Sequence, residues 1–168
     1  PGSVDFANTP THFYFDTAYT KDEKNDPTAG IAYKKIGADF YVLEVAAEWV
    51  EFTEALQFIQ RFCMRNGATG RSIARVEPKA SGKSLVQVLR KQTTLNIKEA
   101  DVPKEDKGAR ANSAAPTVET GRVFLPAGAP WVSEFLAECA AFPNGAHDDR
   151  VDCLTGMIKS ERPGILAR

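Results

Sequence analysis

Apolar residues fall into short runs at the start of the chain and into a longer stripe after them. Three short runs, at residues 12–18, 30–36 and 40–46, are each bounded by polar or turn-forming residues. Residues 37–39 suit a hairpin turn between the second and third runs. We therefore expect three antiparallel strands. Apolar residues then recur at helical spacing over residues 52–63, which predicts a helix that packs one face on the sheet.

The rest of the chain alternates shorter strands with helices. Residues 72–76 predict a fourth strand, and a second helix is expected to end near Gln92. Further along we expect a strand at 94–97, a mobile loop or weak helix at 104–120, a strand at 122–126, a helix at 131–142 and a terminal helix capped by Asp148 or Asp149. Strands interspersed with helices predict an α/β fold with a mixed central β-sheet.

The composition is that of one soluble globular domain. The chain has 168 residues, of which 43% are hydrophobic and 26% charged. It has neither an apolar run of the roughly 20 residues needed to cross a bilayer nor a signal segment, so we expect a cytosolic protein without membrane contact. Residues 1–3 are typical of an expression-tag remnant, which leaves 4–168 as the domain and suggests that it belongs to a longer protein.

The cysteines predict neither a disulfide framework nor a zinc site. Cys63, Cys139 and Cys153 are odd in number, widely spaced and surrounded by apolar residues. We expect all three to be core thiols.

The octapeptide EPKASGKS, residues 77–84, resembles the end of a phosphate-binding loop. Such a loop begins with a glycine because the backbone must curl closely around the phosphates. Glu77 stands at that position, and its carboxylate would repel them. We therefore expect no nucleotide site here.

Acidic residues lie at the ends of two expected strands and at the start of the last expected helix, where they form a candidate metal centre. They are Asp16 at the end of the first strand, Glu77 after the fourth, and Asp148, Asp149 and Asp152 at the start of the last helix. Hard carboxylate oxygens suit Mg²⁺ or Mn²⁺, and a pair of such ions can drive phosphodiester hydrolysis. His147 is a secondary candidate, as a ligand or a proton carrier. Turn formation and helix capping are the structural alternatives for these acids.

Charge is unevenly distributed although the formal net charge is only −1. Residues 71–110 contain ten basic and five acidic residues, whereas residues 39–54 contain five acids and no base. The basic stretch is a candidate face for a nucleic-acid backbone or, alternatively, ordinary solvated surface.

Several of these segments together resemble the C-terminal nuclease domain of the large terminase subunit of tailed bacteriophages, which has a ribonuclease H-like fold. The similarity runs through FYFDTAYT, GIAYKKIGADFYVLEV, VEPKASGKSLVQVLR, KGARANSAAPTVETGRVFLP and WVSEFLAECAAFPNGAHDDRVDCL. The resemblance implies that Asp16, Glu77 and either Asp148 or Asp149 bind metal, and that GKS is a coincidence.

This resemblance implies a two-metal DNA endonuclease, using Mg²⁺ or Mn²⁺, that cuts double-stranded phage DNA concatemers in the host cytoplasm. In the whole protein an N-terminal packaging ATPase, the small terminase subunit and the portal would be partners. Basic residues near the acids would face the DNA: Lys79, Lys83, Lys107 and Arg110. The alternatives are a resolvase- or transposase-type strand-cleaving enzyme with the same fold, and a noncatalytic nucleic-acid-binding assembly module.

Overall fold

The computed structural model describes residues 5–18, 26–77, 82–101 and 106–162. The expected tag remnant at residues 1–3 and Lys79 lie outside these ranges, as does the side chain of Lys83. The strands are β1 His12–Asp16, β2 Thr28–Ile36, β3 Asp39–Glu48, β4 Ala74–Val76, β5 Ile97–Glu99 and β6 Val123–Phe124. The helices are α1 Phe52–Arg65, α2 Gly82–Gln92, α3 Lys107–Glu119, α4 Val132–Ala141 and α5 Asp149–Ser160.

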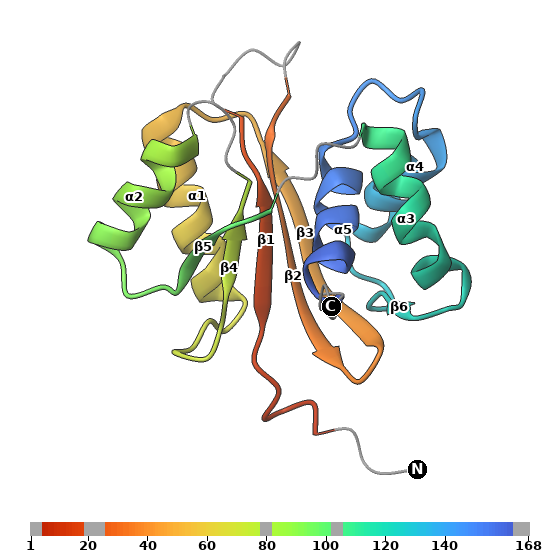
Figure 1. Cartoon of the computed structure of the whole chain (residues 1–168), viewed down its shortest axis with the longest axis horizontal. Helices are drawn as coiled ribbons and strands as arrows, with labels where there is room; N and C mark the ends of the chain where they lie inside the picture. The colour runs from red at the N-terminus through yellow and green to blue at the C-terminus, as the bar shows by residue number, and fades with distance from the viewer. Residues whose placement is uncertain (1–4, 19–25, 78–81, 102–105, 163–168) are drawn as a thin grey trace, which may run out of the picture.

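These strands form one mixed sheet in the order β5-β4-β1-β2-β3-β6 (Figure 1). β1, β2 and β3 are antiparallel neighbours, whereas β4 and β5 run parallel to β1 and β6 runs parallel to β3. The expected α/β fold and its antiparallel opening are therefore confirmed.

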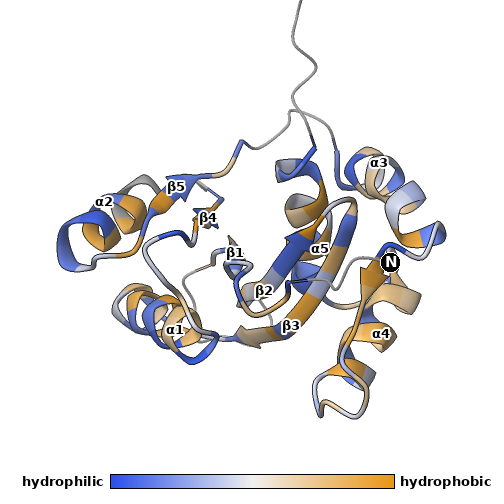
Figure 2. Ribbon diagram, turned by 90° about the horizontal axis from the view of Figure 1, so that it is seen from below, coloured by the Kyte–Doolittle hydropathy of each residue, from blue (hydrophilic) through white to orange (hydrophobic). Residues whose placement is uncertain are grey.

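Helices cover both faces of the sheet, and the alternation along β1 shows which residues meet them (Figure 2). Phe13 and Phe15 point into a core shared with α1 and α2. Tyr14, between them, points into the second core, shared with α5. Helices α3 and α4 lie on that second side, beyond α5 (Figure 1). Each face of the sheet thus packs against its own apolar cluster.

Two expected elements differ from the structure. Residues 104–120, expected as a mobile loop or weak helix, contain α3, which begins after Asp106, whose side chain accepts a hydrogen bond of 2.8 Å from the Ala109 amide. Capping explains a helix in a sequence with few large apolar residues. The strand expected at 94–97 is instead Ile97–Glu99, where it pairs with β4.

The cysteines are free thiols, with Cys63 and Cys153 buried and Cys139 half-buried. Burial raises the pKa of Cys63 to about 12 and that of Cys139 to about 11, which fits unreactive thiols.

Candidate active site

Neighbouring strands bring Asp16 and Glu77 to the same edge of the sheet. β1 and β4 are parallel, with Phe15 opposite Val76, and the Glu77 amide donates a 2.9 Å hydrogen bond to the Phe15 carbonyl. Asp16 and Glu77 therefore lie at the carboxyl ends of two adjacent strands. Both are buried, at 2% and 3% exposure.

Helix α5 brings the third group of acids to this edge. Asp149 and Asp152 in its first turn are buried, and Asp148 immediately precedes it. Asp16 and Asp152 are close enough to raise the pKa of Glu77, although burial is the larger cause. The acids from β1, β4 and α5 thus converge, as the sequence predicted.

Glu77 is held by two donors. The Tyr14 hydroxyl donates to its Oε1 over 2.8 Å, and Arg110 Nη1 lies 3.3 Å from the same oxygen. Both contacts favour the carboxylate and oppose the effects of burial and of Asp16, yet the pKa of Glu77 is still raised. Burial therefore outweighs the two donors in setting the pKa of Glu77.

Lys107 bridges the acids of α5. Its Nζ lies 2.6 Å from Asp148 Oδ1 and 3.0 Å from Asp152 Oδ2, and Arg110 Nη2 lies 3.6 Å from Asp152 Oδ1. Burial alone would lower the pKa of Lys107, but its hydrogen bonds to the two carboxylates outweigh this and raise it. Burial raises the pKa of Asp152 despite the opposing effect of Lys107. The first turn of α3 thus supplies internal cations to the cluster.

Asp148 does not cap α5 through its side chain, contrary to one expectation, because its carboxylate faces Lys107. Glu138 of α4 takes that role: its Oε1 accepts from the Arg150 and Val151 amides over 2.7 and 3.2 Å. The Arg150 guanidinium also contacts Glu138 Oε2 at 2.8 Å. A carboxylate at a helix N-terminus is favourable, so α4 fixes the end of α5 that carries the acids.

A second group of ligand atoms lies beside the first. Atoms of Asp26, His147 and Asp149 that can bind a metal lie within 4.8 Å of one another. His147 packs edge-on against Trp49, with ring centroids 5.5 Å apart, and its buried Nδ1 has no hydrogen-bond partner among the described residues. Two carboxylates and an imidazole are a plausible donor set for a divalent cation. His147 is thus placed where a ligand or proton carrier would be useful.

Close packing between α5 and β1 keeps Tyr14 against Glu77. A Cβ atom added at Gly156 would lie only 2.2–2.5 Å from the ring and hydroxyl of Tyr14. Only a residue without a side chain lets the helix approach this closely. Gly156 therefore determines the position of the Tyr14 hydroxyl and, through it, that of Glu77.

Of the basic residues predicted to face DNA, Lys107 and Arg110 point to the carboxylates instead of outward. Sequence reasoning missed Tyr14, Asp26 and Glu138. Asp26 stands in the polar stretch between the first two strands, and no periodicity in that stretch assigns it a partner. Tyr14 was detectable as the one hydroxyl among the aromatic residues of β1.

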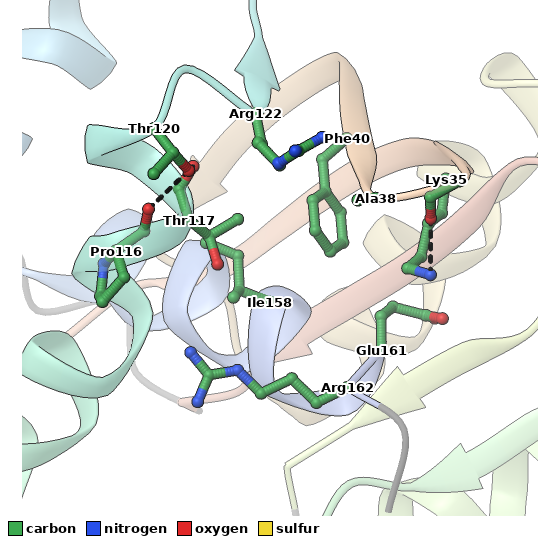
Figure 3. Close-up of a pocket in the computed structure, with 11 residues that line it drawn as sticks. Lys35, Ala38, Phe40, Pro116, Thr117, Thr120, Arg122, Ile158, Glu161 and Arg162 are labelled. Atoms are coloured by element: carbon green, nitrogen blue, oxygen red, sulfur yellow. Dashed lines mark hydrogen bonds between the residues drawn. The ribbon is translucent and has the colours of Figure 1, made fainter.

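A cavity of about 470 Å³ lies near the other end of α5, between the β2–β3 hairpin and the end of α3 (Figure 3). Phe40, Pro116 and Ile158 form its apolar lining. Its one acid, Glu161, is engaged by Tyr33 at 2.7 Å and Arg75 at 2.8 Å. This cavity therefore lacks the converging carboxylates of the candidate active site.

The chain belongs to the family of terminase RNaseH-like domains, whose family model matches residues 13–161. Among solved structures it is similar to the zinc-bound large terminase nuclease of the thermophilic phage G20c, with a TM-score of 0.69 and 14% identity over 93% of this chain and 84% of that one. The human cytomegalovirus terminase nuclease domain has a TM-score of 0.65 and 13% identity, with 94% and 85% covered.

The chain spans only part of some similar proteins. It matches the large terminase of another thermophilic bacteriophage with a TM-score of 0.64 and 13% identity, covering 91% of this chain but 40% of that one. No curated protein sequence matches the chain. None of the helices in the described ranges is long and apolar enough to cross a membrane.

Proposed function

We propose that the chain is a metal-dependent endonuclease domain that cuts double-stranded phage DNA concatemers during genome packaging. One observation carries the proposal: buried carboxylates from β1, β4 and α5 converge at one edge of the sheet, where burial first, and then Asp16 and Asp152, raise the pKa of Glu77. Such a concentration of oxygen ligands in a family of terminase domains supports metal-dependent phosphodiester hydrolysis.

Asp16, Glu77 and Asp152 are the proposed ligands on one side of the cluster. Asp149 and Asp148 belong to it through α5, and Asp149 also faces Asp26 and His147. A pair of Mg²⁺ or Mn²⁺ ions at such carboxylates supplies an activated water and stabilises the leaving oxygen. The donor set fits these ions because it is rich in hard oxygen atoms.

Other side chains orient the carboxylates and balance their charge. Tyr14 donates to Glu77 and keeps one of its oxygens turned toward β1. Lys107 is half exposed, at 47%, so its long side chain can also reach a phosphate at the mouth of the site. Lys79, Lys83 and Arg110 remain proposed DNA contacts.

The whole protein would extend beyond this chain. We propose that it carries an N-terminal packaging ATPase, works with the small terminase subunit and the portal, and acts in the host cytoplasm. Phosphate contacts carry no base information, so partners would supply the choice of cutting site.

Plasmid cleavage tests the proposal. Asp16→Asn, Glu77→Gln and Asp149→Asn should each abolish cleavage in Mg²⁺ or Mn²⁺ while leaving the fold intact. Glu119→Gln, at an exposed acid of α3, is the matched control and should cut normally. Ca²⁺ should bind yet support little cleavage, because it tolerates irregular coordination.

Two results would contradict the proposal. Equal cutting in EDTA and Mg²⁺ would exclude metal dependence, and full activity in any two of the three site variants would exclude the assigned residues. Preference for branched over linear duplexes would favour a resolvase, and absence of Mn²⁺ or Mg²⁺ binding at millimolar concentration would favour a noncatalytic module.

A further inference from the structure

A groove of about 430 Å³ lies between the β4–β5 edge of the sheet and the last turn of α5. Its lining includes four basic residues, Arg75, Lys98, Lys159 and Arg162, and two acids, Glu99 and Asp101. Figure 2 shows that the helices on this side gather over β1, β2 and β3.

The alternation of strand residues puts the groove on the same face of the sheet as the carboxylates. Tyr14 pairs with Arg75, and Arg75 pairs with Lys98, so these three form one row across β1, β4 and β5. Residues two apart on a strand share a face, which places Asp16 beside Tyr14 and Glu77 beside Arg75. Glu99 follows Lys98 and belongs to the other face of β5, yet it still borders the groove, as Asp101 does.

The charge of this groove is only partly neutralised. Arg75 forms an ion pair of 2.8 Å with Glu161, and both side chains are largely buried. Lys98 is exposed and forms no ion pair with any residue of the described ranges. Lys159 lies across the groove from it, in the last turn of α5. The groove is thus lined by an arginine that Glu161 engages and by two lysines, of which Lys98 is the one without an ion pair among the described residues.

Helix geometry gives the spacing between groove and active site. Asp152 and Lys159 are seven residues apart, which is about two turns, so they lie on the same side of α5 about 10 Å from each other. A DNA duplex rises about 3.4 Å per nucleotide of each strand, so this spacing corresponds to about three base pairs. A backbone whose reacting phosphate lies at the carboxylates can therefore pass the two lysines.

We propose that this groove binds the backbone of duplex DNA about three base pairs from the cutting site, through Lys98 and Lys159. The inference rests on the proposed nuclease function and adds the path of the substrate.

Salt-dependent binding of a short fluorescein-labelled DNA duplex tests the groove. The variant Lys98→Glu/Lys159→Glu is compared with its parent, both in an Asp16→Asn background with Ca²⁺ present, so that the DNA is not cut. Arg61→Glu/Lys91→Glu, on α1 and α2 at the opposite face, changes the net charge equally and is the control. Each lost phosphate contact lowers the slope of log affinity against log salt by about 0.9.

We expect the slope of the groove variant to fall by about 1.8 and that of the control to stay near the parental value. With Asp16 intact, the groove variant should retain kcat on plasmid DNA and raise KM. Equal slopes in the groove variant and the parent would overturn the inference, as would a parent that binds no DNA. So would a groove variant that loses affinity for polyglutamate but not for DNA, since the groove would then accept an acidic protein.

The two proposals fail separately. If cutting depends on Asp16, Glu77 and Asp149 but the groove variant binds DNA like its parent, the nuclease function stands and the proposed DNA path is wrong. Loss of metal-dependent cutting in the wild-type protein would remove the nuclease function itself.

Discussion

Gly156→Ala tests how tightly the fold and the candidate active site are coupled. The new methyl group would lie 2.2 Å from Tyr14 Cζ and 2.3 Å from Cε1. These are much shorter than an ordinary carbon–carbon contact of about 3.5–4.0 Å, so either the ring or α5 must move. Tyr14 is buried and its hydroxyl is bonded to Glu77, so the ring cannot simply rotate into solvent.

One stabilising and two destabilising contributions set the expected change in the free energy of unfolding. Replacing glycine by alanine in a helix favours folding by about 1 kcal/mol. Overpacking a filled core costs about 1–3 kcal/mol, and a contact this short belongs at the upper end of that range. Disturbing the hydrogen bond to a charged carboxylate adds about 1.5–3 kcal/mol. We therefore expect a net loss of about 3.5–5 kcal/mol, a decrease in Tm of about 7–20 °C for a chain of this size.

Thermal unfolding in EDTA and plasmid cleavage in Mn²⁺ are the two measurements. Gly70→Ala is the control, since a methyl group there meets nothing within 4 Å. The double variant Gly156→Ala/Tyr14→Leu should be less destabilised than the sum of its single changes, because the smaller side chain makes room. A Gly156→Ala protein with normal Tm and normal cleavage would refute the reasoning that this contact positions Glu77.

Further predictions concern the charges of the site. Tyr14→Phe should cost about 1–3 kcal/mol of unfolding free energy, measured by urea titration, because Glu77 loses a donor while it stays buried. Glu77→Gln should raise Tm in EDTA at neutral pH. The pKa of Glu77 in the folded protein lies above its ordinary value of 4.5, so the wild-type protein loses stability as pH rises from the ordinary pKa through the native one. Below the ordinary pKa the wild-type carboxyl group is protonated, and the gain from Glu77→Gln should disappear. Lys107→Met should lower Tm in EDTA and enlarge the rise in Tm on adding Mn²⁺, since Asp152 loses its nearest cation; an unchanged response to Mn²⁺ would contradict competition between Lys107 and metal. Neither the wild-type chain nor its Lys83→Ala variant should hydrolyse ATP. ATP hydrolysis that depends on Lys83 would restore the phosphate-loop interpretation.

The parts of the fold that the sequence predicted well are those with strong local signals. Local sequence alone indicates three of these parts: the strand HFYFD, the hairpin turn before Phe40 and the apolar stripe of α1. Helix α3 was uncertain because its apolar residues are few, and its N-terminus depends on the Asp106 cap. Strand β5 has three residues, and its position is decided by pairing with β4, a contact that no local pattern records.

The candidate site also has residues that the sequence could predict and residues that it could not. Asp16 and Glu77 were predictable because each lies at the end of a strand, and parallel neighbouring strands end at one edge. The placement of Lys107 and Arg110 was not predictable, since it depends on how α3 packs against α5. A count of basic residues indicated a DNA-binding stretch, but only the three-dimensional arrangement distinguishes cations that face carboxylates from those that face the groove.

This distinction links the metal and DNA halves of the proposed function. Lys107 lies 3.0 Å from Asp152, so a divalent cation that binds this carboxylate competes with an ammonium group already there. Because several carboxylates are buried close together at this edge of the sheet, a bound cation should both stabilise the fold and reduce the repulsion of an approaching phosphate. Lys159 lies about 10 Å away along α5, and Lys98 lines the same groove, so both stand apart from the carboxylates that would bind metal. DNA affinity should therefore have a metal-dependent part at the carboxylates and a metal-independent part in the groove, and comparing the salt slope in EDTA with that in Ca²⁺ separates them.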